Sequence, residues 1–491
     1  MTDRRLTISI ERLLRIVLSA AVLAVLAAAL EAAPAPAAFR AGAATSVITP
    51  NLGGAIIGGF VPFPATHIHD ELHVRCLVLD DGKTRLAIVV CDLLGISSIV
   101  STEARKAIEE KLKIPAENVL ISATHTHSAI SALNKSPDQK PDEYQRQVIG
   151  RIVDGVQSAA NLLRPAQVAW GTAQAPEHVF NRRWHLKPGT MPPNPFGTID
   201  KVKMNPAPGS ADLLEPAGPT DPTITILALR EPNGKPIAVF SVYSLHYVGG
   251  VGPGHVSADY YGMYCRELER LLEAEHQDPP FVAMMANGTS GDVNNIDFVH
   301  PRPGKPAYEQ MRYVAHDVAG KVAAALKGMT YRDSATLTAK FQTLVLKSRR
   351  PSEAQIAWAK NLIASREKKP DQADLPLIYA ERTLRLADSP ETCPLGLQTL
   401  RIGDLLLGTM PCEVFCEIGL EFRKRSPTQP AALVSLAHGY EGYLPTPRHF
   451  ELGGYETWLG TNRLESEASV KMLDCLGGLV RATREARQEQ P

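Results

Sequence analysis

Two histidines separated by a single residue, His125 and His127, follow an apolar run at residues 118–123 that predicts a β-strand. In an extended chain, residues i and i+2 point to the same side, so both imidazoles can reach one metal ion or one reacting group. Imidazole is the commonest metal ligand and a general acid or base near neutral pH, although a lone histidine is more often structural. The pair therefore indicates a metal site or a catalytic site, with two structural histidines as the alternative.

Two further polar clusters follow apolar runs. His246 ends the run at residues 237–245 and precedes Gly249 and Gly250; taken alone, it is more typical of a core histidine bonded to backbone. Asp292 lies in a loop rich in glycine and asparagine after the run at 281–286. Such a loop lets backbone approach a ligand and lets Asp292 hold a neighbouring group, but an ordinary turn has the same composition.

Late in the chain, Glu413 follows a predicted strand and a Pro-Cys turn. This position suits a carboxylate ligand or base, and it equally suits a first-turn glutamate that complements a helix dipole. Tyr443 and Tyr455 lie in glycine- and proline-rich loops, where tyrosines often only cover the edge of a core.

The elements that must position these residues alternate between apolar β-branched runs and amphipathic helical patterns. This alternation predicts an α/β fold with mixed sheets flanked by helices in one large catalytic domain. Strands are expected at 85–91, 118–123, 167–171, 223–229, 237–245, 281–286, 400–409 and 432–437, and helices at 101–112, 144–163, 260–275, 308–327, 352–367, 414–425 and 465–484. Because open α/β sheets bind ligands beyond the carboxyl ends of their strands, the polar clusters are expected to meet.

The chain is expected to divide at residue 38. Arginines precede an apolar run at 16–30, and small residues follow it, so residues 1–38 are predicted to be a signal peptide. The run is shorter than the roughly 20 residues that span a bilayer, which favours cleavage over an uncleaved anchor. The domain then covers 39–491, exported to the periplasm or secreted. A helical insertion is expected at about 330–394, and no internal repeat is visible.

Composition narrows the function. The chain has 491 residues, of which 44% are hydrophobic, and 52 lysines and arginines balance 52 aspartates and glutamates. This balance gives no electrostatic reason to expect a nucleic-acid partner. The seven cysteines are scattered, and a domain of this size does not depend on disulfides.

Taken together and in order, these motifs resemble the catalytic domain of the neutral/alkaline non-lysosomal ceramidases, zinc amidases that split the N-acyl bond of ceramide. The resemblance runs from about Ala41 to the C-terminus. It rests on the strand with His-Thr-His-Ser, Leu-His followed by Ser-Ala-Asp-Tyr, the Gly-Asp-Val loop, Pro-x-Glu and Gly-Tyr-x-x-Tyr. It implies that Zn²⁺ is held by His125, His246, Glu413 and Tyr443, with room for a water as catalytic zinc requires.

The resemblance also implies roles for neighbouring residues. His127 corresponds to the acid/base that deprotonates the water and later protonates the departing amine. Tyr455, together with Arg182, is expected to bind the substrate carbonyl as negative charge develops there. Arg183 competes with Arg182 for this role. Otherwise Arg183 is expected to contact the substrate, together with Asp292 and Asn294 of the Gly-Asp-Val loop.

Two departures from the family pattern shape the expected function. Asn294 stands where the family has a serine, and the family's C-terminal immunoglobulin-like domain is expected to be missing here. The expected function is therefore hydrolysis of an amide in a small-molecule or lipid N-acyl substrate, with peripheral membrane contact for substrate access. The alternatives are a metallohydrolase for an ester or phosphoester and a catalytically weakened binding relative.

Overall fold

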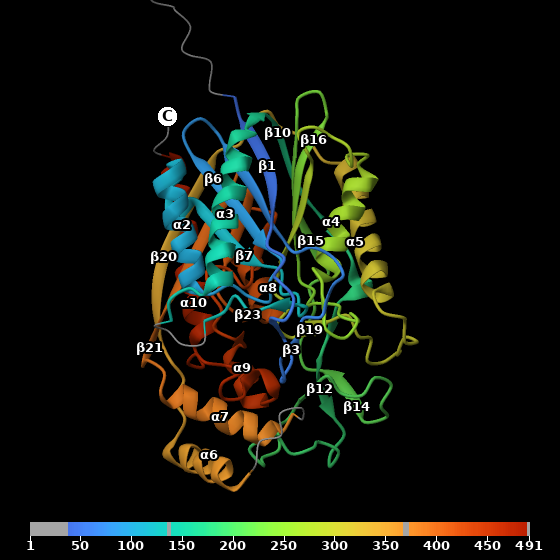
Figure 1. The fold of residues 1–491 in the computed structure, drawn as a ribbon, viewed down its shortest axis with the longest axis vertical. Coiled ribbons are helices and arrows are strands. Elements are labelled where there is room, and N and C mark those ends of the chain that lie inside the picture. Colours follow the sequence, from blue (N-terminus) through green and yellow to red (C-terminus); the bar gives the residue numbers. More distant parts are fainter. Residues whose placement is uncertain (1–37, 135–138, 367–372, 489–491) are drawn as a thin grey trace, which may run out of the picture. The chain divides into compact units, whose positions relative to one another are not determined.

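Three β-sheets with the same strand order form the body of the fold (Figure 1). The computed structural model describes residues 38–134, 139–366 and 373–488, and Phe39–Pro491 cluster as one unit. The mixed α/β class expected from the sequence is confirmed. Residues 1–37 of the predicted signal peptide lie outside the described residues. Within the described ranges, no helix is both long enough and apolar enough to cross a membrane.

The first sheet sets the pattern. Its strands β1 (Arg40–Val47), β5 (His73–Asp80) and β6 (Arg85–Cys91) are antiparallel, and the crossover helix α2 (Ser98–Leu112) leads to β7 (Val119–Ala123), which is parallel to β6. A second helix, α3 (Glu143–Asn161), then packs on β1, and β9 (Arg164–Pro165) extends the edge of the sheet beyond β1. The order across the four long strands is last, third, second, first.

The other two sheets repeat this topology. The second repeat contains β10 (Gln167–Gln174), β15 (Thr223–Arg230), β16 (Pro236–Tyr243), α4 (Asp259–Leu271), β18 (Val282–Asn287) and α5 (Glu309–Lys327). The third contains β20 (Leu337–Lys347), β21 (Thr392–Ile402), β22 (Leu405–Thr409), α8 (Cys416–Arg425), β24 (Ala431–Val434) and α10 (Ala468–Gln488). In each repeat the last strand is parallel to the third. The expectation of no repeat holds for the sequence but not for the topology.

The core follows from strands that are apolar on both faces. In β6, Leu86, Ile88 and Val90 face a central cluster to which all three sheets contribute, whereas Ala87 and Val89 face the cluster under α2 and α3. This alternation is the period of two of a strand, and burial of both faces explains why β6 reads as a continuous apolar run. Corresponding outer clusters lie under α4 and α5 and under α8 and α10.

The segments that connect these elements contain short strands and one short helix. They are β2 (Ala55–Ile57), β3 (Phe63–Pro64), β4 (His67–Ile68), β8 (Ala129–Ile130), β11 (Phe180–Asn181), β12 (Arg183–Leu186), β13 (Lys203–Met204), β14 (Leu213–Pro216), β17 (His255–Val256), β19 (Val293–Asn294), β23 (Glu413–Val414), β25 (Tyr443–Leu444) and α9 (Pro447–Leu452). Single 3-10 turns occur at η1 (Ala116–Asn118), η2 (Pro176–His178) and η3 (Tyr455–Thr457).

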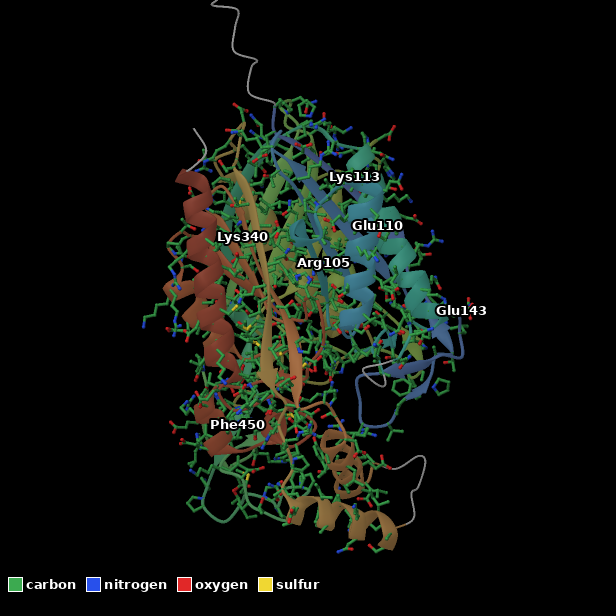
Figure 2. The ribbon with its side chains drawn as sticks, turned by 90° about the vertical axis from the view of Figure 1, so that its left-hand side faces the viewer. Arg105, Glu110, Lys113, Glu143, Lys340 and Phe450 are labelled. Carbon is green, nitrogen blue, oxygen red and sulfur yellow. The ribbon has the colours of Figure 1, made fainter. Side chains whose placement is uncertain are left out.

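Two local expectations need revision. The strand expected at 400–409 is a hairpin of β21 and β22, because Gly403 has a φ of 60°, which reverses the chain. Among the described residues of 330–394, β20 is a strand of the third sheet, and the helices are α6 (Glu353–Ser365) and α7 (Leu375–Ala387), which pack on each other. Figure 2 shows Arg105 of α2 beside β20, where its guanidinium carbon lies 3.9 Å from the Phe341 ring centroid.

The contact of α3 with β1 predicts a contrast between two glycines. A Cβ on Gly42 of β1 would lie 2.1 Å from the carbonyl oxygen of Ala159, which is backbone and cannot move aside. Gly42→Ala is expected to lower the free energy of unfolding by about 1–3 kcal/mol through overpacking. Gly150→Ala, on the exposed face of α3 with open space around it, is expected to raise it by about 1 kcal/mol. Urea denaturation measures both; equal effects would contradict this close contact.

Candidate metal centre

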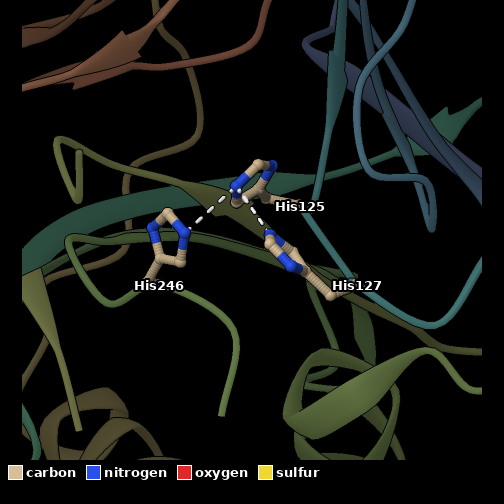
Figure 3. A group of neighbouring side chains, drawn as sticks. All are labelled: His125, His127 and His246. Carbon is tan, nitrogen blue, oxygen red and sulfur yellow. Dashed lines mark hydrogen bonds between the residues drawn. The ribbon is translucent and has the colours of Figure 1, made fainter. Parts of the chain in front are cut away.

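Three imidazoles, drawn in Figure 3, converge in a buried cluster with the carboxylate of Glu413. The Nε2 atom of His125 lies 3.2 Å from Nε2 of His127 and 3.2 Å from Nε2 of His246. Oε2 of Glu413 lies 3.2 Å from the His125 nitrogen and 3.8 Å from that of His246. A tetrahedral zinc ion with bonds of about 2.0–2.1 Å separates its ligands by about 3.3 Å, so this spacing fits a metal centre.

Two of the histidines, His125 and His246, are oriented by backbone carbonyls. Nδ1 of His125 lies 2.6 Å from the carbonyl oxygen of Leu94, and Nδ1 of His246 lies 3.1 Å from that of Ser290. Because a carbonyl only accepts hydrogen bonds, each Nδ1 must carry the proton, which leaves the Nε2 lone pair for the cluster. Both rings are therefore held in the tautomer that a metal ligand requires.

The premise that led to the histidine pair is wrong in one respect. Strand β7 ends at Ala123, and His125 has a φ of 76°, so the chain turns between the two histidines and does not continue as a strand. The two rings meet edge to face, with centroids 4.7 Å apart. Their nitrogens converge through this left-handed turn, which is uncommon for a residue other than glycine and is typical of functional sites.

Glu413 reaches the cluster from β23, which is parallel to β25 and places Glu413 opposite Tyr443. Helix α8 begins only at Cys416, so the alternative of a first-turn glutamate is wrong. Tyr440 donates a hydrogen bond of 2.7 Å to Oε1, whereas the buried Oε2 has no hydrogen-bond partner among the described residues. Burial acts to raise the pKa of Glu413, but His125 and the phenols of Tyr443 and Tyr440 lower it. The carboxylate is thus anionic, with one oxygen free for a cation.

Every repeat contributes both of its parallel strand ends. In the first, Leu94 follows β6 and His125 follows β7; in the second, His246 follows β16 and Ser290 follows β18. In the third, Glu413 follows β22 and Tyr440 and Tyr443 follow β24. These residues therefore come together beyond the carboxyl ends of the strands, as expected from the sequence.

Arg182 and two tyrosines border the cluster. The Arg182 guanidinium donates to Glu456 through Nε at 3.0 Å and to the Gly291 carbonyl through Nη2 at 2.8 Å, and its carbon lies 5.3 Å from the Tyr443 ring centroid. Burial acts to lower the pKa of Arg182, but Tyr443 and Glu456 raise it above its usual value. The Tyr455 ring lies 5.6 Å from that of Tyr443, and burial raises its pKa to about 12. Arg182 is a cation here and Tyr455 a neutral donor.

Arg183 lies on the other oxygen of the same carboxylate. It is fully buried and donates to Glu456 Oε2 at 2.5 Å and to the Gly453 carbonyl at 2.6 Å. Of the two arginines that the sequence left in competition, Arg182 is the one in contact with Tyr443. Arg183 holds the loop that carries Tyr455.

Asp292 and Asn294 make their hydrogen bonds to loop residues rather than to the imidazoles. Asp292 accepts from the backbone N–H of Cys416 at 2.8 Å and from the Asn181 amide at 2.9 Å, and burial raises its pKa to about 6. The Asn294 amide donates to Asn205 at 2.7 Å. Their expected contact with substrate stays a prediction.

Several residues in the site escaped the sequence reasoning. The Tyr247 ring stacks on His127 with centroids 3.7 Å apart, and a Cβ on Gly58 would lie 2.7 Å from the same imidazole. Burial lowers the pKa of His127 well below its usual value, and His125 and Arg182 add to this effect. Because Tyr247 directly follows His246, its position in the sequence could have identified it as part of the site. Gly58 lies in the loop between β2 and β3, and nothing in the sequence indicated its role.

A second group of histidine and carboxylates lies outside this site. Glu177, His178 and Asp317 have ligand atoms close together, but Lys321 pairs with both carboxylates, at 2.9 Å in the case of Asp317. His178 Nε2 lies 2.7 Å from the same aspartate. An ammonium group already supplies the positive charge, so this group is an ion-pair network.

The hydrogen bond from Tyr440 predicts an effect on metal affinity. Tyr440→Phe removes only the hydroxyl that orients Glu413, and loss of such a partner typically weakens metal binding 10- to 100-fold. Chelator competition with Zn²⁺ measures the change. Tyr264→Phe is the matched control, because it removes a buried hydroxyl bonded to Ser241 at 2.7 Å on α4. Equal zinc affinity in both variants would refute this role for Tyr440.

Comparisons with known proteins identify the family and the fold of this chain. The sequence profile described as "Neutral/alkaline non-lysosomal ceramidase, N-terminal" matches residues 39–298. The neutral ceramidase of Pseudomonas aeruginosa superposes with a TM-score of 0.67 at 16% identity, over 91% of this chain and 75% of that chain. A structure titled "Ceramidase complexed with C2" superposes with a TM-score of 0.66 at 15% identity, over 91% of this chain and 76% of that one. At such identity the structures show the shared fold, and the profile shows that this chain belongs to the neutral/alkaline non-lysosomal ceramidase family.

Proposed function

We propose that the protein is an exported, zinc-dependent amidohydrolase that cleaves the amide bond of an N-acyl compound, with N-acyl-sphingoid lipids as one candidate class. The observation that carries this proposal is the convergence of His125, His246 and the unpartnered Oε2 of Glu413. A carboxylate oxygen buried without a partner is costly unless a cation or donor meets it.

The residues present fit a zinc ion. His125, His246 and Glu413 would hold it, with Tyr443 opposite Glu413 as the fourth proposed ligand. Bound there, Zn²⁺ would act as a Lewis acid and make a water available as hydroxide near neutral pH.

His127 is the proposed proton carrier. Its Nε2 faces the cluster, and its ring is held between Tyr247 and the backbone of Gly58. The depressed pKa keeps the imidazole neutral, so that it accepts a proton from the attacking water and returns it to the departing amine.

Arg182 and Tyr455 are proposed to stabilise the carbonyl oxygen as it becomes negative. Both are donors held rigidly, Arg182 by Glu456 and Gly291, and Tyr455 by contact with Tyr443. Donors fixed before the reaction stabilise developing charge without reorganisation. Asn294, bonded to Asn205, would shape the substrate side of the loop without reaching the reacting atoms.

The direct test uses purified protein and three substrate panels: N-acyl compounds, acyl esters and phosphoesters. Turnover of N-acyl compounds, lost on chelation and restored by Zn²⁺, is expected. His125→Ala and His246→Ala should lose zinc, whereas His127→Gln should keep zinc and lose about 10²–10⁴-fold in kcat. Cleavage restricted to phosphoesters would overturn the amidase proposal, and unchanged zinc content in the His125 and His246 variants would overturn the metal centre.

The two arginines on Glu456 should separate into a kinetic and a structural residue. Arg182→Gln is expected to lower kcat by about 10²–10³-fold, as for removal of a donor to a developing oxyanion. Arg183→Gln is expected to act mainly on stability, lowering the free energy of unfolding by about 3–5 kcal/mol, because it breaks a buried pair. Steady-state kinetics and denaturation on both variants measure this. A larger loss of kcat in the Arg183 variant would reverse the assignment.

Export is part of the proposal and rests on the basic and apolar segments of residues 1–38. N-terminal sequencing of the protein recovered from an exporting host tests it. A start near residue 39 is expected, and an intact N-terminus in the cytoplasm would contradict it.

A further inference from the structure

A guanidinium without a carboxylate partner lies beside the site. Arg382 of α7 is half-buried, and its Nη1 donates to the Thr461 hydroxyl at 3.0 Å and to the Tyr379 hydroxyl at 3.2 Å. Both acceptors are neutral. Among residues 38–134, 139–366 and 373–488, no carboxylate forms an ion pair with Arg382, and no acceptor bonds to its Nε or Nη2.

Arg382 is connected to the metal centre through aromatic rings. Its guanidinium carbon lies 5.6 Å from the Phe60 ring centroid, the Phe60 ring lies 5.9 Å from that of Tyr455, and Tyr455 contacts Tyr443. The charge of Arg382 also acts on the Tyr455 phenol, where it opposes the rise in pKa that burial causes. Arg382 therefore lies near the proposed carbonyl-binding tyrosine, Tyr455, with the Phe60 ring in contact with both.

Other buried or half-buried arginines are satisfied differently. Arg182 and Arg183 share Glu456, and Arg423 pairs with Asp221 at 2.6 Å. Arg349 donates to the carbonyl of Thr457. In Arg382 the Nε–Nη2 edge, the edge that binds a carboxylate or phosphate with two parallel hydrogen bonds, is left over.

The electrostatics of the surroundings favour an anion at this edge. Arg182 and Arg183 share a single glutamate, so these three side chains carry a net positive charge. The Asp200 carboxylate, which contacts Trp458 beside Tyr455, keeps its negative charge, because the Trp458 indole at 2.8 Å and the Asn194 amide at 3.1 Å that donate to it are neutral; among the described residues it forms no ion pair with Arg382. Phe60 and Tyr379 hold the Arg382 guanidinium by cation–π contact and limit its hydration.

We propose that Arg382 binds an oxyanion, a carboxylate or a phosphate, that the N-acyl substrate carries several bonds away from the amide. This inference rests on the proposed function and narrows its substrate class to N-acyl compounds with an anionic group. The aromatic rings between Arg382 and Tyr443 would contact the part of the substrate that joins the anion to the amide.

The test compares matched substrates. An N-acyl amino acid is set against its methyl ester, and an N-acylethanolamine O-phosphate against the free N-acylethanolamine, so that the two arms separate carboxylate from phosphate. Wild type is expected to prefer at least one anionic member by tenfold or more in kcat/KM. Arg382→Gln should lose this preference, mainly through a higher KM for the anionic member of the pair. Arg382→Lys should keep part of it, because an ammonium retains charge but not the two-pronged geometry.

Arg230→Gln is the matched control. Arg230 also stacks on a tyrosine, with 3.8 Å from its guanidinium carbon to the Tyr331 ring centroid, and also bonds a neutral side chain, Gln167. It pairs with Pro236 at the start of β16, whereas His246 follows the end of that strand. The preference should survive in this variant.

The outcomes separate this inference from the proposed function. If N-acyl compounds are hydrolysed but wild type shows no preference in either arm, or Arg382→Gln keeps it, the inference is overturned and the amidase stands. If nothing is hydrolysed, calorimetric Kd values for the same pairs decide: tighter binding of an anionic member to wild type, lost in Arg382→Gln, supports the anion site, and equal binding refutes it.

Discussion

The structure depends on one electrostatic constraint: Nε2 of His125 lies 3.2 Å from Nε2 of His127, from Nε2 of His246 and from Oε2 of Glu413, and Oε2 of Glu413 lies 3.8 Å from Nε2 of His246. Lone pairs at such distances repel unless a proton or a cation lies between them. With Nδ1 of His125 and His246 committed to donating to carbonyls, Nε2 of both rings is an acceptor. A divalent cation would satisfy Nε2 of His125, Nε2 of His246 and Oε2 of Glu413 together, which is why the cluster is more consistent with a metal centre than with structural histidines.

The surrounding shell limits how these atoms can move. Tyr440 fixes one oxygen of Glu413, Glu456 fixes Arg182 and Arg183 together, and Tyr247 fixes the plane of His127. None of these partners is near its target in sequence. These contacts lie away from bulk water, which strengthens each interaction and raises the free-energy cost of leaving a polar group without a partner.

Local sequence patterns predicted the strands that lead to this site, but they did not predict features that depend on contacts between distant residues. Apolar runs marked β6, β7, β16 and β18, because strands buried on both faces leave a continuous signal. They did not reveal the turn at His125, where φ is 76° and the residue bonds the carbonyls of Leu93 and Leu94 in the loop after β6. Nor did they separate Arg182 from Arg183, since that choice depends on Glu456, which is distant in sequence. The repeated topology was not visible in the sequence, because three sheets can have the same strand order without having the same residues at corresponding positions.

That shared topology makes the centre a sensor of complete folding. Each repeat supplies a different component: the first an imidazole pair, the second an imidazole, the third a carboxylate and phenols. Since no single repeat holds a full ligand set, affinity for the ion arises only when all three have docked, and the binding free energy is distributed over their mutual interfaces. Occupancy of the centre would then report on perturbations far from it, such as a loosened helix on the outer face of any sheet. A bound ion would therefore link the three repeats as well as take part in the reaction.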